Sequence, residues 1–493
     1  MLFINKANKP IVIFLVILTT FVTVLLGFVH LYIPFIVIGG ISAMYLFYNP
    51  KQLIYVLCFL MFTNGYIRMQ LNQFTGVSLF IDLLIMTLYI KLLFDCLFQK
   101  KLNLILQAPM LSSIVIFSLY CLLRLFPAGI EFSARIHSLR GVLYYIFLYF
   151  VGYFYYFDKQ EFKRFCLFYA FMLLLLCVYA LSQQFLGFSA RELDWVRYLE
   201  SNRHTSMYTS EEIRVFSLQC TALDFACLLG LFIPAGIPYI LSLPSKYHLH
   251  GLLELIFIAF ISTLTFIRMA MVSWLIASLI ICILLWHLKY FNPNNFGKIL
   301  VAIFSFLLVV VLGFSTLSFS TGKNLDVLLN RVKSIGALTS FNSISQQSTR
   351  GRNEINSMYH RISIWQNRIV STKNPFLGDG LGVLKTTAYS TSGLGQREDV
   401  TDNTYISIYC EIGVIGLLLF LNMIFGWLMF YFKQLKRSPL LCLMPIGMIV
   451  SFLIMMAGNE ASIQTPIRLN IWLLLGMFCR KIKENDILPS TFN

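Results

Sequence analysis

Residues 403–432 read NTYISIYCEIGVIGLLLFLNMIFGWLMFYF, and Glu411 is the one charged side chain in this run. An α-helix rises 1.5 Å per residue, so roughly 20 mostly apolar residues cross the hydrocarbon core of a bilayer. The run is therefore predicted to form a membrane-spanning helix. Stretches of the same kind follow one another along the chain, separated by short polar breaks.

The composition of the whole chain agrees with this interpretation. Of the 493 residues, 58% are hydrophobic and only 12% are charged, which is outside the range of soluble proteins. The sequence predicts an all-α polytopic integral membrane protein with about fourteen transmembrane helices. The predicted spans are 10–29, 32–49, 52–66, 77–98, 109–126, 139–157, 165–187, 218–243, 249–267, 269–288, 298–317, 403–432, 440–458 and 466–480.

Lysines and arginines in the short loops predict the orientation of these helices, because such loops are enriched in positive charge on the cytoplasmic side. One alternating set of loops and both tails are basic, so the two termini are expected in the cytoplasm and the long loops 188–217 and 318–402 outside. The basic set is Lys100, Lys101, Lys159, Lys163, Arg164, Lys289, Lys298, Lys433, Lys436 and Arg437.

Five segments follow from this topology. Transmembrane helices are expected in 1–187, 218–317 and 403–493, the last with a cytoplasmic tail. Residues 188–217 form a first long exoplasmic loop, and residues 318–402 form the main one.

Cysteine usage and charge exclude several functions. The eleven cysteines lie in or beside apolar segments, which suggests neither a disulfide framework nor a zinc site, and we expect no metal and no other cofactor. The net charge is +16, but the basic residues are scattered between apolar spans, so no nucleic acid partner is expected. Membrane lipid headgroups and phosphorylated substrates are the expected anionic partners.

Ionisable residues within the predicted spans are candidates for function, because a charge at membrane depth is costly. Under the topology above they fall toward the exoplasmic ends of their helices, which predicts a polar cavity on that side. The alternative is that they reach the nearby interface or pair with one another. The set is Asp82, Arg124, Arg140, Asp224, Arg268, Glu411, Glu460 and Arg468.

The segment RISIWQNRIVSTKNPFLGDGLG, residues 361–382, combines two signals. Arg361, Trp365 and Ile369 recur at helical spacing and predict an amphipathic helix on the membrane surface, which Asn374 and the following proline end.

The second signal is a tight turn. Gly378, Gly380 and Gly382 permit backbone conformations and close approaches that a side chain would prevent, as a turn beneath a substrate requires. Farther along, Asp402 is expected to cap the next span, and Gly413 with Gly416 would let that span pack closely on a neighbour.

The order of these residues resembles the O-antigen ligase and O-antigen polymerase superfamily. Its motif elements here are Arg361, Trp365, Asn374 with Pro375, the three turn glycines, Asp402 with Asn403 and Tyr405, and Glu411 with Gly413 and Gly416. Two weaker similarities, IRVFSLQCTALDFA from residue 213 and FIRMAM from residue 266, supply Arg214 and Arg268. The resemblance implies a GT-C-like glycosyltransferase architecture with a long exoplasmic loop.

The resemblance also implies a reaction. Where ligases usually carry His-Asn, this chain carries Asp402-Asn403, which favours a polymerase that joins undecaprenyl-diphosphate-linked oligosaccharides at the bacterial inner membrane. A chain-length regulator and a flippase are further expected partners. A ligase is the alternative within the superfamily. A flippase is the alternative outside it, although a flippase would not need the long outer loop.

Guanidinium groups can hold a leaving diphosphate in place of a metal, because they stay charged and grip phosphate oxygens with paired donors. Arg214, Arg268 and Arg361 are expected to do so, with Arg140 in reserve. Asp402 is the candidate for the base or the group that orients the acceptor hydroxyl, and a helix N-cap is the alternative for it.

The remaining candidates for substrate contact have simpler alternatives. His360 could also be an ordinary loop histidine, Glu411 could pair with an arginine across helices, and Trp195 could either stack on a sugar or pack beneath its loop. Six tyrosines are assigned to an aromatic belt at the membrane interface, namely Tyr144, Tyr145, Tyr149, Tyr153, Tyr155 and Tyr156. The substrate-binding set is Arg140, His360, Trp365, Gly378, Gly380, Asn403 and Tyr405.

Overall fold

A computed structural model describes residues 47–71, 76–98, 101–126, 130–155, 157–203, 207–209, 212–290, 361–384, 403–458 and 465–487. Six helices in these ranges are long and apolar enough to cross a membrane, which supports a polytopic helical membrane protein. They are α9 (Lys159–Leu186), α11 (Ala222–Ser242), α12 with the preceding 3₁₀ turn η3 (Ser245–Leu264 together), α13 (Arg268–His287), α18 (Thr404–Gln434) and α19 (Pro439–Gly458).

Other helices complete this part of the fold. They are α3 (Pro50–Gln70), α4 (Gly76–Phe98), α5 (Leu102–Leu106), α6 (Leu111–Leu123), α7 (Phe132–Leu139), the π-helical turn η2 (Arg140–Tyr144), α8 (Leu148–Phe154), α10 (Ala190–Arg203) and α20 (Thr465–Ile487). Within the span Ser245–Leu264, η3 is Ser245–Tyr247 and α12 is His248–Leu264. A further helix covers residues 361–371. One small hairpin pairs β1 (Tyr208–Thr209) with β2 (Glu212–Ile213).

Apart from the break in span 403–432 at Gly413, the helices match the predicted spans wherever both can be compared, except in one region. Spans 10–29 and 298–317, and most of 32–49, lie outside the described residues, so the count of fourteen and the GT-C-like architecture stay predictions. The exception is 139–157, which was expected as one continuous helix. It is broken into η2 and α8, because a π turn adds a residue to the helical repeat. The amides that follow the π turn donate to carbonyls three residues earlier, as the N–H of Ile146 does to Leu143 O.

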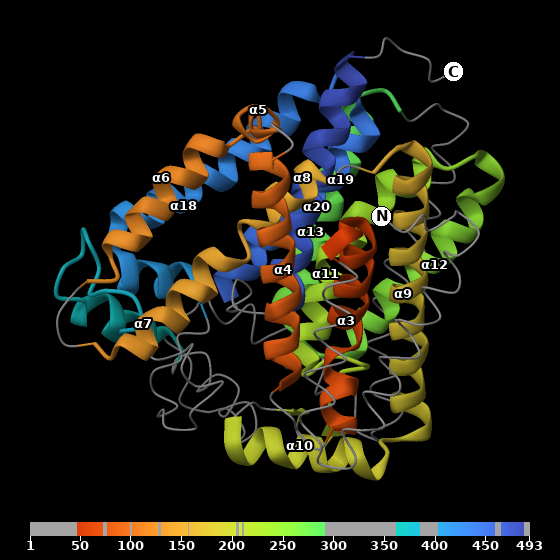
Figure 1. Ribbon diagram of the computed structural model, residues 1–493. Helices are drawn as coiled ribbons and strands as arrows, with labels where there is room; N and C mark the ends of the chain where they lie inside the picture. Colours follow the sequence, from red (N-terminus) through yellow and green to blue (C-terminus); the bar gives the residue numbers. More distant parts are fainter. Residues whose placement is uncertain are drawn as a thin grey trace.

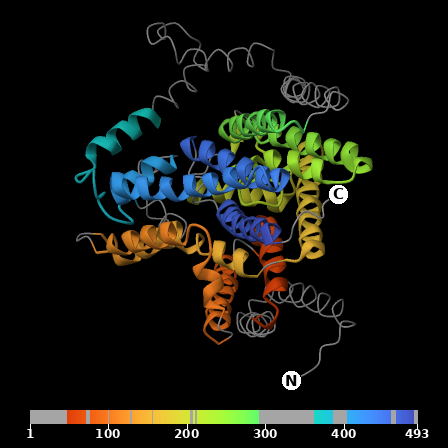
Figure 2. The same cartoon turned by 90° about the horizontal axis from the view of Figure 1, so that it is seen from above.

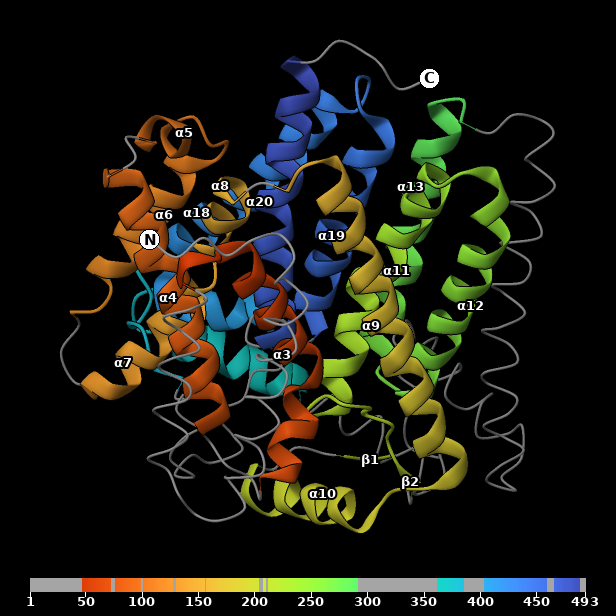
Figure 3. The same cartoon turned by 45° about the vertical axis from the view of Figure 1, so that its right-hand side comes forward.

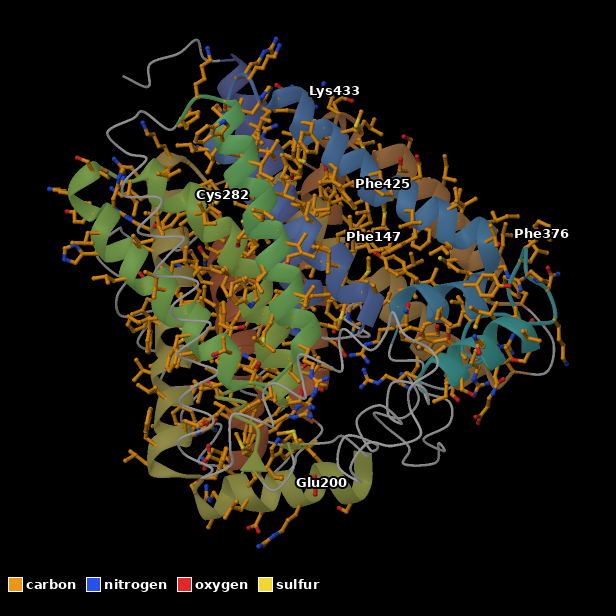
Figure 4. The ribbon with its side chains drawn as sticks, turned by 180° about the vertical axis from the view of Figure 1, so that it is seen from behind. Phe147, Glu200, Cys282, Phe376, Phe425 and Lys433 are labelled. Carbon is orange, nitrogen blue, oxygen red and sulfur yellow. The ribbon has the colours of Figure 1, made fainter. Side chains whose placement is uncertain are left out.

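The long helices run between two ends of the molecule (Figure 1). Helix α10 lies across one end, which we call the α10 end. Glu200 on α10 lies far from Lys433 near the end of α18 (Figure 4). The predicted basic loops beside α5, α9, α13 and α18 thus gather at the end opposite α10 (Figure 3).

The core is built from close helix contacts. Helix α11 packs against α13 and α19, and α20 packs along α8. Gly152 and Gly476 permit the second contact, because a Cβ on either would overlap backbone atoms of the opposite helix. Helices α6 and α18 form a pair that leans away from this bundle (Figure 1).

The tyrosine belt prediction is wrong for three of the described tyrosines. Tyr145, Tyr149 and Tyr153 are at most 2% exposed and lie in the protein core rather than at a membrane interface. A buried tyrosine needs a hydrogen-bond partner for its hydroxyl, and the fold supplies one. The Tyr149 hydroxyl donates to the Pro109 carbonyl at 2.6 Å, for example. The side chain of Tyr156 lies outside the described residues.

Outside the membrane, a capping box starts α9. The backbone N–H of Glu161 donates to the Asp158 carboxylate at 2.7 Å, and this hydrogen bond lowers the pKa of Asp158. The same helix ends at Gly187, whose φ of +83° and ψ of −178° form a conformation that only glycine adopts readily.

Candidate functional site

Helix α18 is interrupted at Gly413, where φ is +70° and ψ is −175°. Such a break leaves carbonyls before it and N–H groups after it without helical partners. At membrane depth these groups must be satisfied by other parts of the protein. Gly413 was expected to permit close packing of a continuous helix, and the structure shows that it divides the helix instead.

The Gly-rich turn of residues 374–382 fills this break. Its N–H groups donate to carbonyls of the first half of α18, and its carbonyls accept from N–H groups of the second half. The four hydrogen bonds are Asp379 N to Cys410 O at 2.8 Å, Gly380 N to Glu411 O at 2.9 Å, Val414 N to Pro375 O at 2.9 Å, and Ile415 N to Phe376 O at 3.2 Å. The turn therefore replaces the missing part of the helix ladder.

The turn and the break approach each other too closely for a side chain. A Cβ on Gly378 would lie 2.5 Å from the backbone nitrogen of Gly413, and a Cβ on Gly382 would lie 2.6 Å from the carbonyl carbon of Ala134. Gly378 and Gly413 also both have positive φ. The glycines were predicted to form a tight turn, and this is confirmed. The surfaces that demand glycine are backbone segments of the protein itself.

Helix α6 holds the same assembly from the other side, so that α18 runs between the turn and α6 (Figure 2). The hydroxyl of Tyr120 donates to the carbonyl of Ile412, beside the break, at 2.9 Å. The guanidinium of Arg124 donates to the carbonyl of Gly378 at 2.6 Å. Arg124, one of the ionisable residues predicted near a cavity, thus fastens the turn to α6.

Glu411 joins the turn to α7. Its Oε1 accepts the backbone N–H of Gly382 at 3.0 Å, and its Oε2 accepts the Ser138 hydroxyl at 2.6 Å. Its side chain lies in the interior, because the residue is 6% exposed. The predicted pairing with an arginine is not among these bonds.

Two arginines flank the π turn that follows α7. Arg140 forms an ion pair with Asp82 of α4. Arg468 of α20 donates to the Gly141 carbonyl at 2.7 Å, and its guanidinium lies 4.4 Å from the ring centre of Tyr145. Arg468 is 8% exposed, and its Nε has no hydrogen-bond partner among the described residues. Arg468 is therefore a buried cation, whereas the Arg140 side chain is 36% exposed and its charge is paired with Asp82.

The three arginines predicted to hold a diphosphate lie beside or at the start of three different elements. Arg361 is the first described residue of helix 361–371, Arg268 is the first residue of α13, and Arg214 follows β2. Arg361 and Arg268 are exposed and Arg214 is partly exposed. All three elements start toward the α10 end of the molecule (Figure 3). Their joint action on one ligand stays a prediction.

The helix of residues 361–371 agrees with the predicted amphipathic segment. It ends before Asn374, as expected, and Trp365 is half-buried while Ile369 is 44% exposed. Its C-terminal end contacts α18, where the Thr372 hydroxyl lies 3.6 Å from the sulfur of Cys410.

The start of α18 differs from the prediction. Asn403 is the N-cap, and its side-chain oxygen accepts the N–H groups of Tyr405 and Ile406. Asp402 was expected in this role, but the helix begins one residue later. The Asn403 amide also donates to Ala457 O at 2.8 Å, and the Tyr405 hydroxyl donates to Leu453 O at 2.7 Å. Asn403 and Tyr405, which were predicted to contact the substrate, therefore hold the start of α18 against α19. Asp402, His360 and Glu460 lie outside the described residues.

Several structural residues of this site were missed. Asp379 accepts the N–H groups of Lys373 and Asn374, and an aspartate between two glycines is a turn signal that the sequence does carry. Ser138 and Tyr120 have no such signal, because their partners lie 273 and 292 residues away along the chain. For Trp195 the packing alternative is confirmed, since it is 2% exposed and donates to Cys220 O at 2.9 Å.

We compared the sequence with models of known protein families. Residues 253–421 match the family model described as O-antigen ligase. Residues 253–421 are a domain of the O-antigen ligase/polymerase superfamily. The matched region contains α12, α13, the segment 361–384 and the break in α18, so the docked turn lies within this superfamily domain. A search of curated proteins finds no match.

Members of this superfamily are glycosyltransferase-like enzymes that act on lipid-linked sugars. The family match is compatible with polymerisation and with ligation.

Proposed function

We propose that the protein is a polysaccharide polymerase that joins undecaprenyl-diphosphate-linked repeat units on the exoplasmic face of the bacterial inner membrane. One observation supports this most strongly. The superfamily turn is docked beside the π turn that carries Arg140, through the contact of Glu411 with Ser138. The recognised motif therefore adjoins a π turn that carries Arg140 and contacts the buried Arg468.

The proposed reaction is a glycosyl transfer. The bond between the anomeric carbon of the donor and its diphosphate breaks, and a hydroxyl oxygen of the acceptor unit forms the new bond. Undecaprenyl diphosphate leaves with the electron pair, and the hydroxyl proton passes to a base. Arginine donors aimed at the diphosphate lower the barrier because they stabilise the charge that develops on it.

Arg214, Arg268 and Arg361 are assigned to that diphosphate, with Arg140 as a further cation. Asp402 is assigned as the base or the group that orients the acceptor, since a carboxylate can accept a hydroxyl proton within hydrogen-bond reach. Asn403 supplies the cap of α18, so the cap is not the role that Asp402 is assigned here.

The Asp402-Asn403 pair favours polymerase over ligase, because ligases of this superfamily usually carry His-Asn there. Ligation is the second candidate, since the matching family model is described as O-antigen ligase. In both reactions the donor is a lipid-linked glycan, and the acceptor distinguishes them.

The proposed orientation places the α10 end outside and the basic end, with both termini, in the cytoplasm. The positive charge of the loops beside α5, α9 and α18 supports this orientation. Undecaprenyl-diphosphate oligosaccharides would then meet the docked turn from the outer leaflet. A chain-length regulator and a flippase are the proposed protein partners.

The test is incubation of the purified full-length protein with one defined undecaprenyl-diphosphate oligosaccharide, with and without a chelator. A polymerase produces a ladder of products on a gel in both samples. A ligase produces no ladder but transfers the glycan to an added lipid A core. If neither product forms, and deletion cells accumulate single units on the cytoplasmic face, the flippase assignment replaces this proposal.

A further inference from the structure

We infer that Glu411 is a positioning residue, whose carboxylate holds the Gly-rich turn and the π turn of Arg140 in one fixed relation. The inference rests on the proposed function, because positioning matters to the extent that Arg361 and Arg140 serve the same reaction. Glu411 acts through Gly382 and Ser138.

The two oxygens of Glu411 face two different segments. Oε1 accepts from the turn at Gly382, and Oε2 accepts from α7 at Ser138, at 3.0 and 2.6 Å. Both donors are neutral groups. A carboxylate is an acceptor on both sides and can bind two donors at once, which makes Glu411 a bridge between these segments.

Each end of this bridge continues into a segment that carries an arginine. The turn continues backwards into helix 361–371, and the Asp379 carboxylate fixes the connection by accepting the N–H of Lys373. On the other side, Ser138 lies two residues before Arg140, where α7 passes into η2. The carboxylate of Glu411 therefore connects the turn that follows the Arg361 helix with the helix that precedes Arg140.

The hydrogen-bonding pattern of this bridge separates positioning from proton transfer. A glutamine has nearly the same shape, its oxygen can accept from Gly382, and its amide nitrogen can donate to the Ser138 oxygen. Glu411→Gln should therefore keep the bridge, while Glu411→Ala removes both bonds. If Glu411 instead transferred a proton, both variants would lose activity, because neither keeps the carboxylate.

The experiment compares Glu411→Gln, Glu411→Ala and the control Glu254→Ala, which removes a half-buried carboxylate from α12. Hydrogen exchange of residues 374–384 and polymerisation are both measured on the full-length protein. In Glu411→Ala we expect exchange in the turn to rise and turnover to fall, each by about tenfold or more, with KM changed less than turnover. Glu411→Gln and the control should stay within about threefold of the native protein.

Two results would overturn the inference. One is unchanged exchange of the turn in Glu411→Ala. The other is a Glu411→Gln variant that is as inactive as Glu411→Ala while its turn stays protected, because the charge itself would then be needed. If the native protein makes no polymer, the proposed function fails and the exchange measurement still decides whether Glu411 holds the turn.

Ser138→Ala provides a second route if Glu411→Ala does not fold. It removes one of the two bonds and leaves the contact with Gly382. We expect a smaller rise of exchange, in residues 132–144 more than in the turn. No change in either segment would also contradict the inference.

Discussion

The backbone nitrogen of Gly413 lies 2.5 Å from the position that a Cβ on Gly378 would occupy. These glycines, 35 residues apart in the sequence, therefore meet at one point where a turn enters a broken membrane helix. Stability and catalysis are expected to depend on this contact, because it places the segment that bears Arg361 against α18.

Gly413→Ala should destabilise the protein strongly. The substitution forces alanine into a conformation that costs about 1–3 kcal/mol, and its Cβ also overlaps the turn. Gly187 offers a matched control, since its backbone angles are nearly the same and nothing lies within 4 Å of its Cβ position. Thermal unfolding of full-length protein in nanodiscs should show a much larger loss for Gly413→Ala than for Gly187→Ala. Equal losses would mean that the turn does not fill the break.

Tyr120→Phe should weaken the same assembly without adding bulk. The substitution removes the hydroxyl that donates a hydrogen bond to the carbonyl of Ile412. Loss of such a bond to a buried acceptor costs about 1–3 kcal/mol of folding stability. The unfolding midpoint should fall measurably. Tyr247→Phe, at an exposed tyrosine next to α12, serves as control and should leave the midpoint unchanged.

Arg140→Ala should reduce turnover more than Asp82→Asn does. The first removes the proposed phosphate donor, and loss of one such donor lowers turnover by roughly 100-fold or more. The second keeps the guanidinium and removes only its ion-pair partner. Arg197→Ala removes an arginine from an exposed ion pair on α10 and controls for general charge effects. If Arg140→Ala polymerises at the native rate, Arg140 has no role in the reaction.

Single alanine substitutions of Arg214, Arg268 and Arg361 test the diphosphate assignment. Each should lower turnover by an amount equivalent to about 3 kcal/mol of transition-state stabilisation, because each removes a charged donor from the leaving group. The measurements are the product ladder and the amount of protein in the membrane. Native chain length at native expression in all three variants would disprove the assignment.

Asp402→Asn and Asn403→Ala should affect different properties. Asn403 caps α18, so its loss should cost about 1–2 kcal/mol of stability. Asp402→Asn keeps a polar side chain and removes the proposed base, so turnover should fall at least about tenfold while the unfolding midpoint stays the same. Full activity of Asp402→Asn would leave this aspartate without a catalytic role.

The sequence by itself determined the features that depend on neighbouring residues. Long apolar runs predict helices such as α9, α13 and α18, because their backbone bonds form within each segment. The spacing of Arg361 and Trp365 predicted a helix that ends before Asn374. The three glycines after it predicted a tight turn, because glycine adopts positive φ readily. The family resemblance was also carried by one contiguous stretch, and the match to residues 253–421 includes that stretch.

Only the tertiary structure decided which groups these elements contact. Lipid tails and neighbouring helices are equally apolar, so hydropathy could not tell that Tyr145 and Tyr149 lie in the protein core rather than at the membrane surface. The bond between Glu411 and Ser138 joins residues 273 positions apart, and no local pattern specifies such a partner. Gly413 breaks its helix for the same reason, because a distant turn supplies the hydrogen bonds that the helix gives up.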